Sequence, residues 1–135
     1  MNYLARREYS ASELAVKLKP FASNLATLQS LIADLSQQGL LSDARFAEQF
    51  VQVKKRKFGA ERLAFDLRGK GVDESLITSH LQAIASEELT NARAVWQKKF
   101  KRAPSNREDW ARQARFLQGR GFSLDIIKQV LSQHD

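Results

Sequence analysis

The sequence predicts an all-α protein, built as a tandem array of about three three-helix repeats in an elongated or curved row. Apolar side chains recur at spacings of three and four along most of the chain, which is the period of a helix. No segment shows the sustained alternation of a strand. A six-residue motif also returns fifty residues later, and such internal repeats are typical of arrays of small helical units.

The repeated motif combines two glycines with a basic residue. Leu-Arg-Gly-Lys-Gly-Val at residues 67–72 returns as Leu-Gln-Gly-Arg-Gly-Phe at residues 117–122, and Ile77 returns at the same offset as Ile127. Each copy reads as a helix, a tight Gly-basic-Gly turn and a second helix. One more helix precedes each copy, at residues 43–57 and 87–102, which completes a unit of three helices.

These units divide the chain into three expected repeats. The second spans residues 42–85 and the third spans residues 86–135. The first, residues 1–41, has a shortened first helix, and its turn is rebuilt as Lys-Pro-Phe-Ala-Ser at residues 19–23. Because a unit this small buries a modest core alone, stacking against its neighbours should share stability across the array.

The helical periodicity also predicts which side chains are buried. Three stretches, residues 25–35, 43–57 and 124–131, each place an apolar stripe on one helix face. The expected core residues are Leu25, Leu28, Leu31, Ile32, Leu35, Phe46, Ala47, Phe50, Val51, Val53, Leu124, Ile127, Val130 and Leu131. Aromatic residues at core spacing are expected inside as well, with the environment of Trp110 left open: Phe46, Phe50, Phe65, Trp96 and Phe116.

Helix boundaries are marked by capping residues. Residues 10–13 and 105–108 each fit a capping box, in which a serine hydroxyl and a glutamate carboxylate exchange hydrogen bonds with free amides. Asp73 and Ser123 stand at N-cap positions directly after the repeated turns. The four glycines of those turns, Gly69, Gly71, Gly119 and Gly121, can end a helix with a positive φ.

Composition excludes several functional classes. The chain has no cysteine, which excludes disulfides and thiolate metal sites. It has two histidines, His80 and His134, which leaves little basis for a Ser-His-Asp triad. Phosphate-binding loops and paired carboxylates for two-metal chemistry are also missing. We therefore expect a protein that is not an enzyme, with no catalytic residues, no cofactor and no metal.

The charge balance favours a polyanionic partner. Lysine and arginine number 22 against 15 acidic residues, a net charge of +7, which suits nucleic acid, an acidic membrane face or an acidic protein groove. The apolar stripes are narrow and no apolar run approaches the ~18–20 residues of a membrane span, so a membrane is not expected. With no secretory signal at the N-terminus, we expect a cytoplasmic monomer.

Basic clusters recur at equivalent places in the second and third repeats. Residues 54–57 form a run of four cations at the end of one helix, and residues 98–102 close the corresponding helix of the next repeat. Cations at helix C-termini offset the macrodipole, but four exceed that need. For any single cation, the alternative to a binding role is a place on an ordinary solvated surface. The expected partner-binding residues are Arg45, Lys54, Lys55, Arg56, Lys57, Arg62, Arg68, Lys70, Lys98, Lys99, Lys101, Arg102, Arg115 and Arg120.

At residues 7–18, 39–47, 67–72 and 120–122, taken together, the chain resembles the RecX family of regulatory proteins. Residues 7–18 are similar to the opening signature of that family, and residues 39–47 resemble its Gly-x-Leu-Asp-Asp-x-Arg-Phe-Ala box, with Ser42 in place of an acidic residue. Residues 67–72 and 120–122 resemble its repeated Lys-Gly-Ile and Arg-Gly-Phe turns. The resemblance covers nearly the whole chain in the family's order, and it implies the same tandem array.

The resemblance implies regulation of the RecA recombinase. Members bind RecA and its filament on single-stranded DNA, and they inhibit ATP hydrolysis, strand exchange and the co-protease role in the SOS response and DNA repair. A nucleic-acid-binding protein of small trihelical units, holding single- or double-stranded DNA weakly and nonspecifically, is the alternative. Acidic residues open the helix after each repeated turn, Asp73-Glu74 and Asp125, which disfavours sequence-specific reading of bases.

Overall fold

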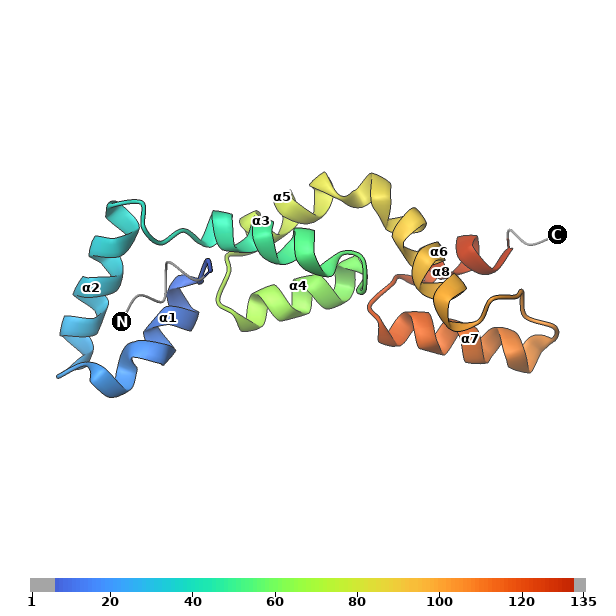
Figure 1. The fold of residues 1–135 in the computed structure, drawn as a ribbon, viewed down its shortest axis with the longest axis horizontal. Coiled ribbons are helices and arrows are strands. Elements are labelled where there is room, and N and C mark those ends of the chain that lie inside the picture. The colour runs from blue at the N-terminus through green and yellow to red at the C-terminus, as the bar shows by residue number, and fades with distance from the viewer. Residues whose placement is uncertain (1–6, 133–135) are drawn as a thin grey trace.

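The computed structural model describes residues 7–132, and every regular element in that range is helical (Figure 1). Eight α-helices and two short 3₁₀ helices follow one another, with no strand in this range. They are α1 (Ala11–Leu18), η2 (Lys19–Phe21), α2 (Leu25–Gln37), α3 (Asp43–Lys54), α4 (Ala60–Gly69), α5 (Glu74–Ala83), η3 (Ala85–Glu87), α6 (Glu88–Lys99), α7 (Arg107–Gly119) and α8 (Leu124–Ser132).

The helices form an elongated row of three groups, which confirms the predicted tandem array. Figure 1 shows α1 and α2 at one end, α3 to α5 in the middle, and α6 to α8 at the other end. Each group surrounds its own hydrophobic cluster. Of the stretch where the shortened first helix of the first repeat is expected, residues 1–6 lie outside the described residues and residues 7–10 are not helical.

The second and third repeats have the larger cores. Leu63, Leu67 and Ile77 are almost fully buried in the second, and burying each such side chain stabilises the fold by about 1.5–3 kcal/mol. The third contains a buried polar pair, in which the Trp96 indole Nε1 donates to Gln113 Oε1 over 2.7 Å. Because a buried amide without a partner is costly, this bond fixes how α6 packs on α7.

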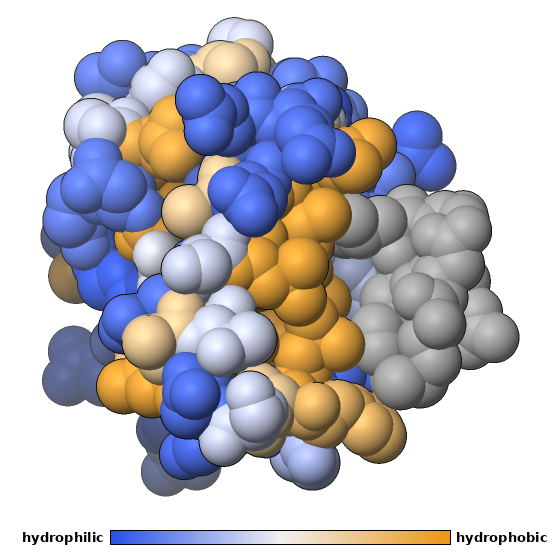
Figure 2. Space-filling view, turned by 90° about the vertical axis from the view of Figure 1, so that its left-hand side faces the viewer, coloured by the Kyte–Doolittle hydropathy of each residue, from blue (hydrophilic) through white to orange (hydrophobic). Residues whose placement is uncertain are grey.

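The first repeat is less completely packed. Its cluster rests on Tyr9, Leu14 and Leu41. Leu25 and Leu31, expected in the core, are instead exposed by 65% and 44%, because α2 packs mainly on α1 and no third helix of the described residues packs closely over its outer face. Figure 2 shows an apolar band on this end of the molecule.

The predicted burial is also wrong for three further residues. Val53, Phe65 and Leu124 are exposed by 64%, 71% and 55%. Each lies at the margin of its helix's apolar stripe, where a period of three or four still counts it but the neighbouring helix does not reach. Of the other aromatics, Phe46 and Trp96 are buried, while Phe50, Phe116 and Trp110 are half-buried against the clusters.

Two helices end earlier than their pattern predicts. The helix expected over residues 43–57 ends at Lys54, because the chain turns there with Lys57 and Phe58 N–H groups both donating to the Lys54 carbonyl. The helix expected over residues 87–102 ends at Lys99, before Lys101 adopts a positive φ of 67°. The basic clusters therefore lie in turns as much as on helices.

Most capping predictions are confirmed. Ser10 forms the full capping box with Glu13, and the Asp73 and Ser123 side chains accept hydrogen bonds from amides of α5 and α8. The box expected at Ser105 is wrong, since the N-cap of α7 is Asn106, whose Oδ1 accepts from the Asp109 amide.

Two of the four turn glycines adopt the left-handed conformation. Gly71 and Gly121 have φ values of 78° and 92°, as expected. Gly69 and Gly119 do not, because they are the last residues of α4 and α7 and keep negative φ. Within residues 7–132, no helix has the length and apolar character to span a membrane.

Candidate partner-binding groove

The turn between α7 and α8 docks onto the start of α4 in the preceding repeat. The Gly59 and Glu61 amides donate to the carbonyls of Arg120 and Gly121 over 2.8 and 3.1 Å. The Ala60 amide donates to the Glu88 carboxylate over 2.6 Å. The first amides of a helix have no partner within it, so the third repeat satisfies the free N-terminus of α4.

At the centre of this junction, the two backbones lie too close together for any side chain to fit between them. A Cβ added at Gly59 would lie 2.4 Å from the Gly121 carbonyl oxygen, and one at Gly121 would lie 2.2 Å from the Arg62 Cβ. Backbone therefore contacts backbone, and the two repeats are held at one spacing. We call this contact the second junction.

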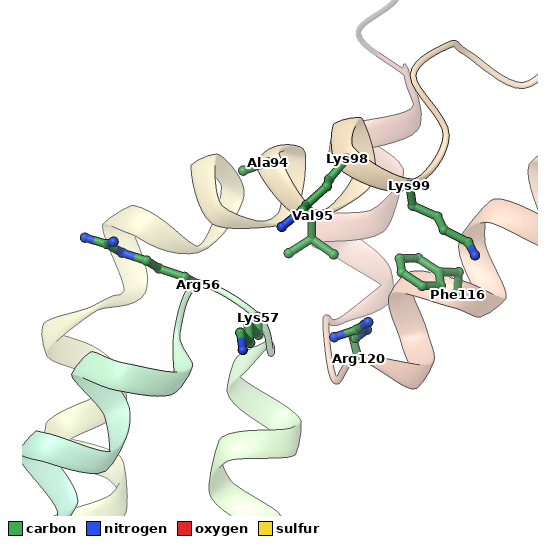
Figure 3. Close-up of a pocket in the computed structure, with 8 residues that line it drawn as sticks. All are labelled: Arg56, Lys57, Ala94, Val95, Lys98, Lys99, Phe116 and Arg120. Atoms are coloured by element: carbon green, nitrogen blue, oxygen red, sulfur yellow. The ribbon is translucent and has the colours of Figure 1, made fainter.

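Beside the second junction, five cations surround a groove of about 550 Å³ (Figure 3). The turn after α3 forms one wall and the C-terminal end of α7 forms the other, and α6 covers both. Ala94, Val95 and Phe116 form the apolar lining. In Figure 3, Val95 and Lys98 extend from α6 over the space between the turns, and Arg56 extends away along the outer rim. The cations of this inter-repeat groove are Arg56, Lys57, Lys98, Lys99 and Arg120.

Aromatic rings hold two of these cations in place. The Lys99 ammonium and the Arg120 guanidinium lie 5.6 and 5.3 Å from the centre of the Phe116 ring. Arg120 also lies 5.5 Å from the centre of the Phe58 ring. Such cation–π contacts contribute about 0.5–1 kcal/mol each at exposed sites and leave the charge uncompensated.

None of the five groove cations forms an ion pair with a carboxylate among residues 7–132. Their neighbours at the second junction do. The Lys55 ammonium lies 2.8 Å from the Glu87 carboxylate, and the Arg62 guanidinium lies 3.2 Å from that of Asp66. The groove therefore keeps concentrated positive charge that a partner can neutralise.

The first and second repeats meet in a contact of the same design, the first junction. The Ala11 amide donates to Asp43 Oδ1 over 2.8 Å, and the Ser10 hydroxyl donates to the Lys70 carbonyl over 2.7 Å. A Cβ at Gly71 would lie 2.1 Å from Ser12 Oγ. The Gly-basic-Gly turn again docks on the helix start of the preceding repeat.

At the first junction the expected binding residues are engaged internally. The Lys70 ammonium lies 3.2 Å from Glu13, and the Arg45 guanidinium lies 3.2 Å from Glu8. Burial would raise the pKa of Glu13, but hydrogen bonds from Arg7 and Lys70 outweigh it and hold that pKa below its ordinary value.

The structure places the other expected cations apart from the groove. Arg68 pairs with Glu74, and this contact lowers the pKa of the Glu74 carboxyl. The Lys54 ammonium lies 5.9 Å from the centre of the Phe50 ring on the second repeat. The remaining three are exposed on the third repeat, outside the groove lining: Lys101, Arg102 and Arg115.

Sequence reasoning missed the apolar lining and the junction residues. Phe116 is predicted to be a core residue, and the prediction is confirmed in part. Its ring packs against the hydrophobic cluster of the third repeat, but it also lines the groove. Gly59 belongs to no sequence motif, and the sequence predicts for Glu88 only a place in the acidic first turn of a helix. Their roles arise from contacts with residues far along the chain. Within residues 7–132 no group of three His, Cys, Asp or Glu side chains could hold a metal ion.

Models of the RecX family match two segments of this chain. The second three-helix domain matches residues 42–81, and the third three-helix domain matches residues 86–131. A regulatory protein RecX from Leptothrix cholodnii is 39% identical over 135 residues, covering 100% of this chain and 86% of its own. Another from Chromobacterium violaceum is 43% identical over 129 residues, covering 96% and 84%.

Solved structures agree in fold. The crystal structure of RecX from Lactobacillus salivarius aligns with a TM-score of 0.84 at 20% identity, over 98% of this chain and 89% of that one. A second crystal structure of a regulatory protein RecX gives 0.85 at 22% identity, over 98% and 69%. With the sequence relatives spanning its full length, the chain belongs to the RecX family.

Proposed function

We propose that this protein regulates the RecA recombinase by binding RecA and its filament on single-stranded DNA. Binding inhibits ATP hydrolysis, strand exchange and co-protease activity, and so modulates DNA repair and the SOS response. The protein acts in the cytoplasm as a monomer, without catalysis of its own. Membership of a family of regulatory proteins supports this function.

The observation that carries the proposal is the inter-repeat groove. Its unpaired cations lie at a junction of an elongated array, where backbone hydrogen bonds hold two repeats together. A filament repeats the same surface along its axis, so a long protein with fixed spacing between repeats can contact successive protomers. Several weak contacts held at fixed distances raise the effective concentration of each and give high avidity.

Nonspecific binding to nucleic acid is the second candidate, and the same unpaired cations favour it. Its affinity would fall steeply with salt, because each phosphate contact releases counterions. Sequence-specific binding lacks support, since the first turns of α5 and α8 carry Glu74 and Asp125, which would repel phosphates.

The test is ATP hydrolysis by RecA on single-stranded DNA, with this protein titrated in. DNA binding is measured separately without RecA. We expect strong inhibition at protein concentrations too low to coat the DNA. Inhibition that appears only when the DNA is saturated would mean competition for the strand, and the second candidate would replace the first. Unchanged hydrolysis at stoichiometric protein would contradict both routes to inhibition.

A further inference from the structure

The inter-repeat groove combines two chemical features that together select a ligand. Its rim carries cations, of which Arg56, Lys57, Lys98 and Lys99 are exposed. Between them lie Val95 and the Phe116 ring, both half-buried. A ligand that fills this groove must therefore present negative charge on its edges and an apolar group in its middle.

Phe116, which lines the groove, and Phe58 beside it offer no open ring face on which a base could stack. Lys99 and Arg120 both lie within 6 Å of the Phe116 ring centre, and Phe100 meets that ring edge-on with centroids 5.4 Å apart. The Phe58 ring is approached by Arg62 and Arg120, at 4.5 and 5.5 Å. Proteins that bind single strands rely on open aromatic faces as stacking platforms. These rings instead position cations.

The groove is also organised before any ligand arrives. Its two walls belong to different repeats, and the Gly59 and Glu61 hydrogen bonds to the Arg120 and Gly121 carbonyls fix their separation. A ligand therefore loses little affinity to ordering of the protein. A short segment of about one apolar side chain and its flanking residues suits a volume of about 550 Å³.

We propose that the inter-repeat groove binds an acidic peptide segment, with one large apolar side chain against Val95 and Phe116 and flanking carboxylates on the lysines and arginines. Carboxylates supply the charge that the rim lacks, and an aliphatic or aromatic side chain supplies the apolar group. This proposal rests on the proposed function, because the segment would belong to the protein partner named there.

The test uses the full chain and synthetic probes, without RecA. The first probe is a fluorescent peptide in which one leucine is flanked by aspartate and glutamate. Its twin replaces the leucine with serine, and a fluorescent oligothymidylate of equal charge is the third. Fluorescence anisotropy then gives each dissociation constant at a fixed, physiological salt concentration.

We expect the leucine peptide to bind roughly tenfold more tightly than its serine twin, as burial of one leucine predicts. The variant Lys57→Gln/Lys98→Gln should weaken the leucine peptide about tenfold. The matched control, Lys19→Gln/Lys128→Gln, removes two exposed lysines outside the groove and should leave binding unchanged. Val95→Thr, which keeps the side-chain shape, should reduce the preference for leucine over serine.

Equal binding of the two peptides would overturn the apolar contact. Equal weakening by both lysine variants would mean that net charge alone attracts the peptide, which would also overturn the proposal. Tighter binding of oligothymidylate, with the same dependence on Lys57 and Lys98, would assign the groove to nucleic acid. The proposed function has a separate readout: peptide binding without RecA inhibition contradicts that function alone, and inhibition without peptide binding contradicts this inference alone.

Discussion

The first and second junctions join repeats by similar contacts, yet they differ in how their positive charge is paired. In each, the amide of a helix's first residue, Ala11 or Ala60, donates a hydrogen bond to a carboxylate. That carboxylate, of Asp43 or Glu88, belongs to the first residue of the next repeat's first helix. In each, a Gly-basic-Gly turn lies against the helix start. The basic residue of the turn then differs in its partner.

At the first junction, Lys70 pairs with Glu13, and the charge is used within the protein. At the second junction, the equivalent residue, Arg120, lies against aromatic rings and keeps its charge available. Glu61 and Arg62 stand near the position that Glu13 occupies in the first repeat, and Arg62 pairs with Asp66 instead. One backbone design therefore serves assembly at one junction and exposes a cationic groove at the other.

The largest expected effect comes from Gly59→Ala. Gly59 has an ordinary φ of −83°, so alanine is tolerated by the local backbone, but the added Cβ would meet the Gly121 carbonyl at 2.4 Å. Because backbone cannot move aside as a side chain can, we expect a loss of about 3 kcal/mol in the free energy of unfolding, measured by urea denaturation. Gly119→Ala, where a Cβ meets nothing within 4 Å, is the control and should be neutral or slightly stabilising.

If the two junctions are equivalent, removing their carboxylates should have similar costs. Asp43→Asn and Glu88→Gln each weaken a charge-assisted bond to a helix N-terminal amide while keeping the side-chain size. We expect each to lower the free energy of unfolding by about 1–2 kcal/mol. If only one of the two variants lowered the free energy of unfolding, the two junctions would not be equivalent.

A smaller effect should distinguish the first junction by its pH dependence. The pKa of Glu13 is lowered in the folded protein, so its stabilisation is present above its ordinary pKa of 4.5 and disappears as pH falls through the lower folded value. Glu13→Gln should cost about 1 kcal/mol at pH 7 and much less at pH 3, measured as the difference in unfolding free energy from the parent. A difference that stays constant with pH would contradict the ion-pair explanation.

The sequence predicts the array well because its signals are local. Helical periodicity, the repeated turns and the caps at Ser10, Asp73 and Ser123 each depend on residues a few positions apart. The errors arise where burial depends on long-range packing: Val53 and Phe65 fit a helical stripe, but they are exposed because no other helix reaches them.

The groove could be predicted only in part. The basic runs identify Lys57 and Lys98 as candidates, but equal weight falls on Lys70 and Arg45, whose pairing with Glu13 and Glu8 requires the folded chain. The essential contact joins Gly59 to Gly121, and no local pattern reveals a pair so distant in sequence.

The central claim is that the charge left unpaired at the second junction is what the partner recognises. Inhibition of RecA ATP hydrolysis on single-stranded DNA tests it most directly, comparing the parent, Lys57→Gln/Lys98→Gln and the matched control Lys19→Gln/Lys128→Gln. Both variants carry the same net charge. We predict that the groove variant requires about tenfold more protein for half-inhibition, while the control matches the parent. Identical curves for the two variants would contradict the account.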